Sequence, residues 1–407
     1  MPLKRACRKA GPHAFLQPMY SPLQPSPDKI SLMPSKSAPL GLLKPVSSIS
    51  PTAKLETDLQ EIDALFVQAG LVRHRREKPA GVARRVRFQD ALPEELSLPP
   101  AEPRVAPNGV EWLPVPKWDK THWLWHGFST RRGGVSRTYC ADGAAGELNL
   151  GFTADDSREN VNRNRQLLAQ AVTGIATTPL VTLRQVHSNV VVIAGASEND
   201  RPCKGDGLMT NEPGLLIGVQ TADCIPVLVA DKKRKVVAAF HAGWRGTVKR
   251  IVEMGIGRMR LEFGSRPEDL LAAIGPGIGP CCYAVGEEVL TEFESQFAYS
   301  SELFSEVNDT DPVRTKYPML FLTQRAPGHS PIGPSLHVNL MEANRRQLLD
   351  AGLKPASIQI VGGCTSCQPA MFFSHRTSKG RSGRMLSVIG IRGRQRRSPL
   401  AEKGEPT

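Results

Sequence analysis

Three short segments of the sequence carry side chains that could hold a metal ion. They are RQVHS (184–188), QTADCIPV (220–227) and FHAGWRGT (240–247). Each places a ligand-type residue, His187, Cys224 or His241, beside an apolar run. Neutral imidazoles and a thiolate are good zinc ligands, and three protein ligands leave a fourth tetrahedral position for water, as in catalytic zinc sites. Zinc lowers the pKa of such a water to about 7, so this pattern indicates hydrolytic or Lewis-acid chemistry.

The spacing of the three residues does not by itself decide between metal binding and its alternatives. They are separated by 36 and 16 intervening residues, which no short metal motif requires. Two hydrogen-bonded histidines and a core cysteine would give the same pattern. So would a cysteine hydrolase in which Cys224 is the nucleophile and His187 or His241 is the base, which needs no metal.

Short strands are expected to position these residues. β-Branched runs bounded by turns predict strands at 123–130, 190–195, 215–219, 225–230, 236–240, 270–274, 357–361 and 385–389. Apolar periodicity predicts helices at 157–172, with Ser157 as N-cap, and at 247–263, 286–297 and 340–351. The segment RRGGVS (131–136) is expected to be a turn. Because strands outnumber helices without alternating strictly with them, the sequence predicts an α+β fold of mixed β-sheets packed together and flanked by helices.

The long apolar runs are confined to one part of the chain. Residues 1–107 are basic and rich in Pro and Ser, apart from one amphipathic helix predicted at 55–70, and residues 395–407 are a second basic segment. Such segments bury too little apolar surface to offset their ordering entropy. We therefore expect a disordered leader over 1–107, a single large folded domain over 108–394, and a flexible tail over 395–407.

The net charge of +13 does not predict specific nucleic-acid binding, because much of it lies outside the predicted fold. Residues 1–54 alone carry eight Lys or Arg and one acidic residue. Flexible basic segments attract polyanions loosely, without reading a base sequence. No apolar run approaches the roughly 20 residues of a membrane span. We therefore expect neither a specific nucleic-acid partner nor a membrane.

The cysteines and the leader bear on the compartment. The chain has eight cysteines and no apolar segment typical of a secretion signal. We therefore expect a protein that is not secreted, with thiols free or metal-bound. The basic, acid-poor leader fits an organellar transit peptide or plain disorder equally well, which leaves a cytoplasmic or an organellar location open. The sequence does not indicate an oligomeric state.

The order of the motifs resembles one known family. RQVHS, DGLMT (206–210), TADCIPV, FHAGWRGT, IGPGIGPCCYAVG and SHRTSKGRSGRMLSVIG follow one another here, preceded by HGFSTRRGGVS and NLGF. Over about residues 120–394 they resemble the laccase-domain proteins, long labelled polyphenol oxidases and now understood as multifunctional purine nucleoside phosphorylases. Gly277, in the GPGIGP loop, is the one position that departs from many relatives.

The resemblance implies a catalytic zinc site made of His187, Cys224 and His241, and two mixed sheets flanked by helices. It also implies that the domain over 108–394 cleaves adenosine, inosine, guanosine and methylthioadenosine with phosphate, and deaminates adenosine as a side activity. The older label implies a multi-copper oxidase instead. Such an enzyme needs many histidines, whereas this chain has nine and no His-x-His pair.

Arg131, Arg184 and Arg245 lie in or beside the motifs and are candidate substrate-binding residues. A phosphate co-substrate needs fixed donors, and a guanidinium offers a planar pair of them. The acidic residues of the motifs have different expected roles. Asp223 adjoins Cys224 and could orient a ligand, act on a proton or simply be a turn residue, whereas Asp206 is expected to be structural.

The remaining cysteines of the motifs are expected to be structural. Cys364 and Cys367 form a CTSC pair with no second CxxC in the chain, so buried or incidental thiols are expected there. Cys281 and Cys282 are adjacent, and adjacent side chains are not expected to share a tetrahedral ion.

Overall fold

A computed structural model describes residues 102–140, 145–195, 203–307 and 334–393. The predicted helix at 55–70, most of the predicted leader and the tail at 395–407 lie outside the described residues. Within the described residues, no helix is both long and apolar enough to cross a membrane.

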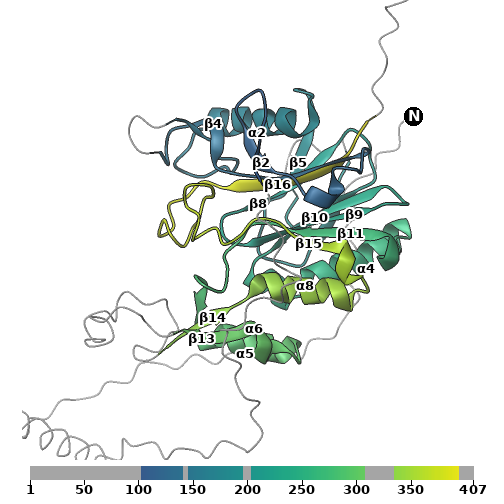
Figure 1. The fold of residues 1–407 in the computed structure, drawn as a ribbon, viewed down its shortest axis with the longest axis vertical. Helices are drawn as coiled ribbons and strands as arrows, with labels where there is room; N and C mark the ends of the chain where they lie inside the picture. The colour runs from purple at the N-terminus through teal and green to yellow at the C-terminus, as the bar shows by residue number, and fades with distance from the viewer. Residues whose placement is uncertain (1–101, 141–144, 196–202, 308–333, 394–407) are drawn as a thin grey trace, which may run out of the picture. The chain divides into compact units, whose positions relative to one another are not determined.

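The first of three sheets has six strands in the order β1-β2-β3-β16-β8-β5 (Figure 1). They are Arg104–Val105 (β1), Glu111–Leu113 (β2), Leu124–Ser129 (β3), Met385–Ile391 (β16), Leu216–Thr221 (β8) and Leu180–Thr182 (β5). β16 is the last of the described strands, yet it pairs antiparallel with both β3 and β8 in the middle of the sheet. Helix α2 (Arg158–Thr173) covers one face, where Leu168 packs against Leu386 and Val388.

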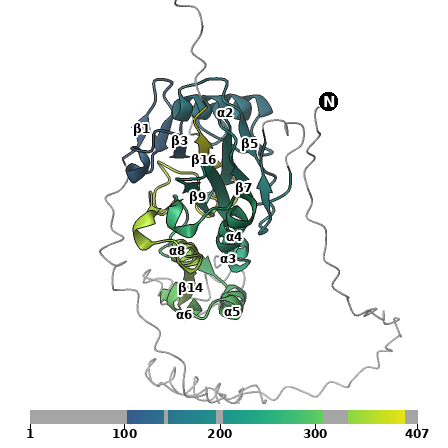
Figure 2. The same ribbon diagram turned by 90° about the vertical axis from the view of Figure 1, so that its right-hand side faces the viewer.

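The second sheet also has six strands, in the order β15-β11-β9-β10-β7-β6. They are Ile358–Ile360 (β15), Leu270–Ile274 (β11), Ile225–Asp231 (β9), Val236–Ala242 (β10), Gly207–Thr210 (β7) and Val191–Ile193 (β6). Helices α3 (Trp244–Val248), α4 (Ile251–Phe263) and α8 (Leu340–Asp350) lie beside its outer face (Figure 2). Both large sheets contain parallel and antiparallel pairs, as the predicted mixed sheets require.

The inner faces of the two large sheets pack against each other. Along β9, Leu228 and Ala230 belong to the core between the sheets, while Val227 and Val229 belong to the core under the helices. Every residue of β9 and β10 is buried, because the two strands are covered on both faces. The α+β fold predicted from the sequence is therefore confirmed.

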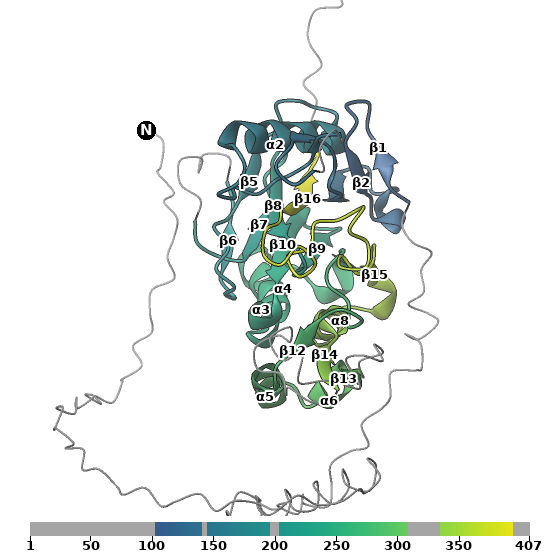
Figure 3. The same cartoon turned by 90° about the vertical axis from the view of Figure 1, so that its left-hand side faces the viewer.

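A third, three-stranded sheet has the order β12-β14-β13. Its strands are Ala284–Val285 (β12), Ser335–Val338 (β14) and Phe304–Val307 (β13). Helices α5 (Glu287–Gln296) and α6 (Ser300–Leu303) accompany this sheet, at the end remote from α2 (Figure 3). Phe293 of α5 stacks edge-on against Phe304 of β13, which joins this small unit to the core of the second sheet.

Most predicted elements are present, and two predictions were wrong. The eight predicted strands and the helices at 157–172, 286–297 and 340–351 are confirmed, and Ser157 caps α2 by accepting the N–H of Asn160 at 3.1 Å. The segment predicted as a turn forms β4 (Arg132–Ser136), because both of its ends pair with Glu147. The helix predicted over 247–263 is broken into α3 and α4, because Arg250 adopts a left-handed conformation with φ of 57°.

Candidate active site

The three predicted metal ligands come together. One ligand atom each of His187, Cys224 and His241 lies within 4.8 Å of the other two. The Cys224 sulfur is 3.9 Å from Nε2 of His187, and the two imidazole rings are 5.0 Å apart and nearly perpendicular. We call these three residues the His-Cys-His triad.

The hairpin of β9 and β10 explains how two of the ligands meet. His241 of β10 pairs with Pro226 of β9, two residues after Cys224, so the strand register places the thiol beside the imidazole. His187 reaches them from the connection between β5 and β6, where its φ of 56° lies in the left-handed region. Gly243 lets the ligands approach one another, because a Cβ there would be 2.9 Å from the Cys224 sulfur and 3.0 Å from Cδ2 of His187.

Asp206 is the residue that orients the two histidines. Its fully buried carboxylate accepts a hydrogen bond from Nδ1 of His241 at 2.9 Å. It also accepts the backbone N–H groups of Val186, His187 and Ser188 at 3.2, 3.0 and 2.6 Å, and the Ser188 hydroxyl at 2.6 Å. Asp206, which we expected to be only structural, therefore contacts one triad side chain and the backbone of another.

The electrostatics of the triad favour a thiolate. Burial would raise the pKa of Cys224, but the charge of His241 and a hydrogen bond from His187 outweigh it and lower the pKa to about 6. Burial would likewise lower the pKa of His241, but the Cys224 charge and the Asp206 hydrogen bond raise it to about 9. Burial works against ionisation of Asp206 too, yet hydrogen bonds from His241 and Ser188 hold its pKa well below the ordinary value.

Asp223 fixes the chain next to Cys224, as expected of a residue that orients a ligand. Its carboxylate accepts the Thr365 hydroxyl at 2.7 Å and the backbone N–H of Arg376 at 2.7 Å. Its own carbonyl accepts the N–H of Ile278 at 2.7 Å, and its φ is 91°. Three segments distant in sequence therefore meet at the residue that precedes the thiol.

The structure does not gather the three candidate arginines at one point. The Arg131 guanidinium is paired with Glu147 at 2.7 Å and lies 4.6 Å from the Phe373 ring centre. Arg184 is exposed, and its backbone pairs with residues 203–205. Arg245 is exposed and its guanidinium lies over the Trp244 ring at 4.3 Å. Their assignment to substrate binding stays a prediction.

Two residues that the sequence analysis did not single out lie beside the triad. Burial, followed by the charge of Cys224, raises the pKa of the Tyr283 hydroxyl, whereas the nearby charges of Arg376 and Arg245 oppose this shift. The Arg376 guanidinium lies 5.3 Å from the centre of the Tyr283 ring. Both residues belong to the motifs IGPGIGPCCYAVG and SHRTSKGRSGRMLSVIG, which was the available signal.

A cavity of about 340 Å³ adjoins the segment that Asp223 holds. Its lining includes Arg131, Tyr139, Phe373, Ser374 and Thr377. The rings of Tyr139 and Phe373 are 5.8 Å apart in an edge-to-face arrangement. Ser374 is two residues from Arg376, whose N–H binds Asp223, and two residues span at most about 7 Å. One loop therefore both lines the cavity and binds Asp223, the residue before Cys224.

The chain is similar to proteins of one known family. Residues 125–392 match the family described as multi-copper polyphenol oxidoreductase laccase. The chain is 34% identical over 273 residues to a purine nucleoside phosphorylase of Bacteroides thetaiotaomicron, covering 65% of this chain and 91% of that protein. It is 37% identical over 266 residues to a purine nucleoside phosphorylase of Deinococcus radiodurans, covering 65% and 88%.

Similarity extends to a human protein and to solved structures. The human purine nucleoside phosphorylase LACC1 is 31% identical over 271 residues, covering 66% of this chain and 55% of that protein. The crystal structure of YlmD from Geobacillus stearothermophilus aligns with a TM-score of 0.55 and 31% identity, covering 69% of this chain and 96% of that one. The chain therefore belongs to the family described as multi-copper polyphenol oxidoreductase laccases.

Proposed function

We propose that this protein is a zinc-dependent purine nucleoside phosphorylase. It would cleave adenosine, inosine, guanosine and methylthioadenosine with phosphate, and would deaminate adenosine as a side activity. The observation that carries the proposal is the convergence of His187, Cys224 and His241 within 4.8 Å of one another. The proposal is supported by the names of relatives such as those of B. thetaiotaomicron and D. radiodurans.

The donor set of the triad fits zinc. Ligands about 2.0–2.3 Å from a tetrahedral zinc ion lie roughly 3.3–3.6 Å apart, so the triad needs only a small contraction. Because Nδ1 of His241 donates to the Asp206 carboxylate at 2.9 Å, Nε2 is the nitrogen that would bind a metal, releasing its own proton as it does so. Zinc held in this way would keep an open coordination position and supply Lewis-acid polarisation there.

The chain's own residues would bind and orient the two substrates. In phosphorolysis, a phosphate oxygen forms a bond to ribose C1′ while the C1′–N9 bond breaks and its electron pair leaves with the purine, which then takes up a proton. The Arg376 guanidinium lies 5.3 Å from the Tyr283 ring, and the charge of Arg245 also acts on the Tyr283 hydroxyl, so these two guanidinium groups are the proposed hydrogen-bond donors to the phosphate. In deamination, water adds to purine C6 and the C6–N6 bond breaks to release ammonia.

The cavity that adjoins the loop bound to Asp223 is the proposed nucleoside site, although no triad residue lines it. Its aromatic side chains, Tyr139 and Phe373, offer apolar surface to a purine, and its hydroxyl groups, including those of Ser374 and Thr377, offer partners to a ribose. Arg131 lines the same cavity, although its guanidinium is already paired with Glu147. A nucleoside there would have to approach the triad past the loop that Asp223 holds.

A cysteine hydrolase remains the alternative, because Cys224 lies 3.9 Å from Nε2 of His187 and its pKa is lowered to about 6. A nucleophilic thiolate beside a histidine is the arrangement of such enzymes. The two proposals differ in metal content, since a nucleophile needs no bound zinc. In either case we expect the protein to act where thiols stay reduced, in the cytoplasm or an organelle, and to bind no specific nucleic acid.

The test combines metal analysis with resolved product assays. The purified full chain is incubated with adenosine and phosphate, and adenine with ribose 1-phosphate is separated from inosine with ammonia. Ala variants of His187, Cys224 and His241 are each expected to lose zinc and both activities while remaining folded. Cys203→Ala and His122→Ala, which lie outside the triad, serve as controls. Cys224→Ala that is inactive but retains the zinc of the parent would support the cysteine hydrolase. A zinc-free Cys224→Ala protein with full activity would overturn both proposals.

A further inference from the structure

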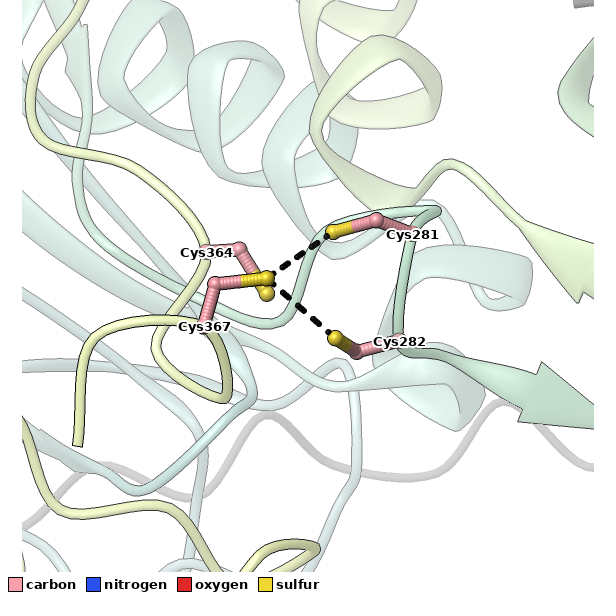
Figure 4. Close-up of side chains that lie close together, drawn as sticks. All are labelled: Cys281, Cys282, Cys364 and Cys367. Carbon is pink, nitrogen blue, oxygen red and sulfur yellow. Dashed lines mark hydrogen bonds between the residues drawn. The ribbon is translucent and has the colours of Figure 1, made fainter. Parts of the chain in front are cut away.

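A second group of metal-binding side chains lies outside the triad. The sulfur atoms of Cys281, Cys282, Cys364 and Cys367 all lie within 4.8 Å of one another. The Cys367 sulfur is 3.5 Å from that of Cys281 and 3.4 Å from that of Cys282. Figure 4 shows the four side chains directing their sulfur atoms toward a common space. We call these residues the four-cysteine cluster.

Adjacent cysteines were not expected to share a tetrahedral ion, yet the sulfur atoms of both Cys281 and Cys282 lie close to that of Cys367. Cys281 and Cys282 come after the loop at 275–280, where the backbone turns, so both sulfurs reach Cys367. Cys364 and Cys367 of the CTSC pair also have neighbouring thiols. These are Cys281 and Cys282, which come from a distant segment and are not spaced as a CxxC pair.

The distances match a tetrahedral ion better than disulfides. With Zn–S bonds of about 2.3 Å, the sulfurs of a tetrathiolate site are about 3.8 Å apart. The closest pairs here, at 3.4 and 3.5 Å, lie near that value. A disulfide needs about 2.05 Å, and all four cysteines are free thiols in this structure. One sulfur that approaches two others also suits a shared ion better than a single covalent pair.

The backbone around the cluster is arranged for close approach. Gly277 pairs with Cys364, and the N–H of Thr365 donates to the Gly277 carbonyl at 3.0 Å. Gly279 leaves the space that the sulfurs need, because a Cβ there would be 3.1 Å from Cβ of Cys364 and 3.2 Å from the Cys281 sulfur. The Cys364 sulfur also accepts the backbone N–H groups of Gly279 and Cys367.

We propose that the four-cysteine cluster is a second, structural zinc site that joins the segment 275–283 to the segment 362–368. Four thiolates fill a tetrahedral coordination shell, so this ion would have no open position for a substrate. Its effect on the triad would be to position Cys224. Ile278 and Thr365 belong to the two joined segments, and each is hydrogen-bonded to Asp223, the residue before Cys224.

Zinc stoichiometry of the full chain, purified under reducing conditions, tests the proposal. The parent is expected to hold two zinc ions per chain. The double variant Cys282→Ser/Cys367→Ser is expected to hold one, His241→Ala is expected to hold one, and the combination of both is expected to hold none. Cys203→Ser, which removes a cysteine outside both groups, is expected to hold two. The number of zinc ions bound by the four cysteines is measured independently of nucleoside turnover. This proposal and the proposed function can therefore fail separately.

Cobalt substitution identifies the ligands without relying on variants that fold. Cobalt in the parent is expected to give the strong sulfur-to-metal charge-transfer absorption of a tetrathiolate, which a site with one thiolate cannot supply. This absorption is expected to persist in His241→Ala. A cobalt-loaded parent without the tetrathiolate absorption, or a disulfide among the four cysteines in the protein as purified, would overturn the proposal. So would a double variant that folds and keeps two zinc ions.

Discussion

Replacing Asp206 by Asn tests whether the triad depends on its buried carboxylate. The change keeps the size of the side chain and removes its negative charge. An amide nitrogen at one oxygen position would face the N–H of His187 and Nδ1 of His241, which now lie 3.0 and 2.9 Å from that oxygen. At the other position it would face the N–H of Ser188, now at 2.6 Å. Either orientation sets donor against donor.

The size of the effect follows from these contacts. A buried donor left without its acceptor costs about 1–3 kcal/mol, and hydrogen bonds to a charged group are stronger than neutral ones. We therefore expect Asp206→Asn to lower the free energy of unfolding by about 2–4 kcal/mol. If the amide nitrogen faces Nδ1, His241 must turn its own N–H toward the metal position. Loss of a carboxylate that orients a histidine ligand costs 10–100-fold in metal affinity, about 1.4–2.8 kcal/mol.

The assay is competition for zinc against a chromophoric chelator, run beside urea unfolding. Asp231→Asn is the matched control: Asp231 is also fully buried and accepts the N–H groups of Lys233 and Arg234 at 2.8 and 2.9 Å. It lies at the opposite end of β9 from Cys224, about 20 Å away along the strand. We expect the control to lose stability and keep its zinc affinity. If Asp206→Asn behaves like the control, Asp206 does not orient the triad.

Three further predictions follow from the structure. Gly243→Ala is expected to weaken zinc binding at least about tenfold, or 1.4 kcal/mol, because its Cβ would be 2.9 Å from the Cys224 sulfur. The control is Gly257→Ala, whose Cβ would have nothing within 4 Å, and it should leave the result of chelator competition unchanged. Ser157→Ala is expected to lower the unfolding free energy by about 1 kcal/mol, measured in urea, because it removes the N-cap of α2. Burial lowers the pKa of His126 to about 4, so the unfolded chain binds more protons between pH 6.5 and 4 and stability falls as the pH drops through that window. His126→Gln should flatten this dependence, by roughly 1–2 kcal/mol at about pH 5, and an unchanged slope would contradict the assignment.

Local pattern was sufficient for the eight predicted strands, whereas the triad as a site was expected only from the family resemblance. Runs such as Ile225–Asp231 are apolar at every position but their last, as expected for strands covered on both faces. The register of β9 and β10 then brings Cys224 to His241. The role of Asp206 could not be predicted in this way. Its partners are 18 to 35 residues distant, and only the folded chain places them around one carboxylate.

The four-cysteine cluster was missed for a related reason. Four-ligand zinc motifs are recognised in a sequence by two pairs of closely spaced ligands. Here one pair is the CTSC pair, whereas the other consists of the adjacent residues Cys281 and Cys282, which do not have that spacing. The two pairs meet because Gly277 and Cys364 lie on paired backbone segments. This contact cannot be predicted from the periodicity of either segment. The break between α3 and α4 was missed too. It occurs at Arg250, and an arginine gives no sign in the sequence that it adopts a left-handed conformation.

The central place of β16 has a consequence for synthesis of the chain. Among the described strands, Met385–Ile391 is synthesised last, yet it lies between β3 and β8 and pairs with both. Until it arrives, both strands have an edge of unpaired backbone groups, and nascent chains in that condition are prone to aggregate. The first sheet can therefore close only after translation has passed residue 391. A premature stop before residue 385 would yield an open-edged, aggregation-prone product, and we expect chaperones to hold the nascent chain until its end is released.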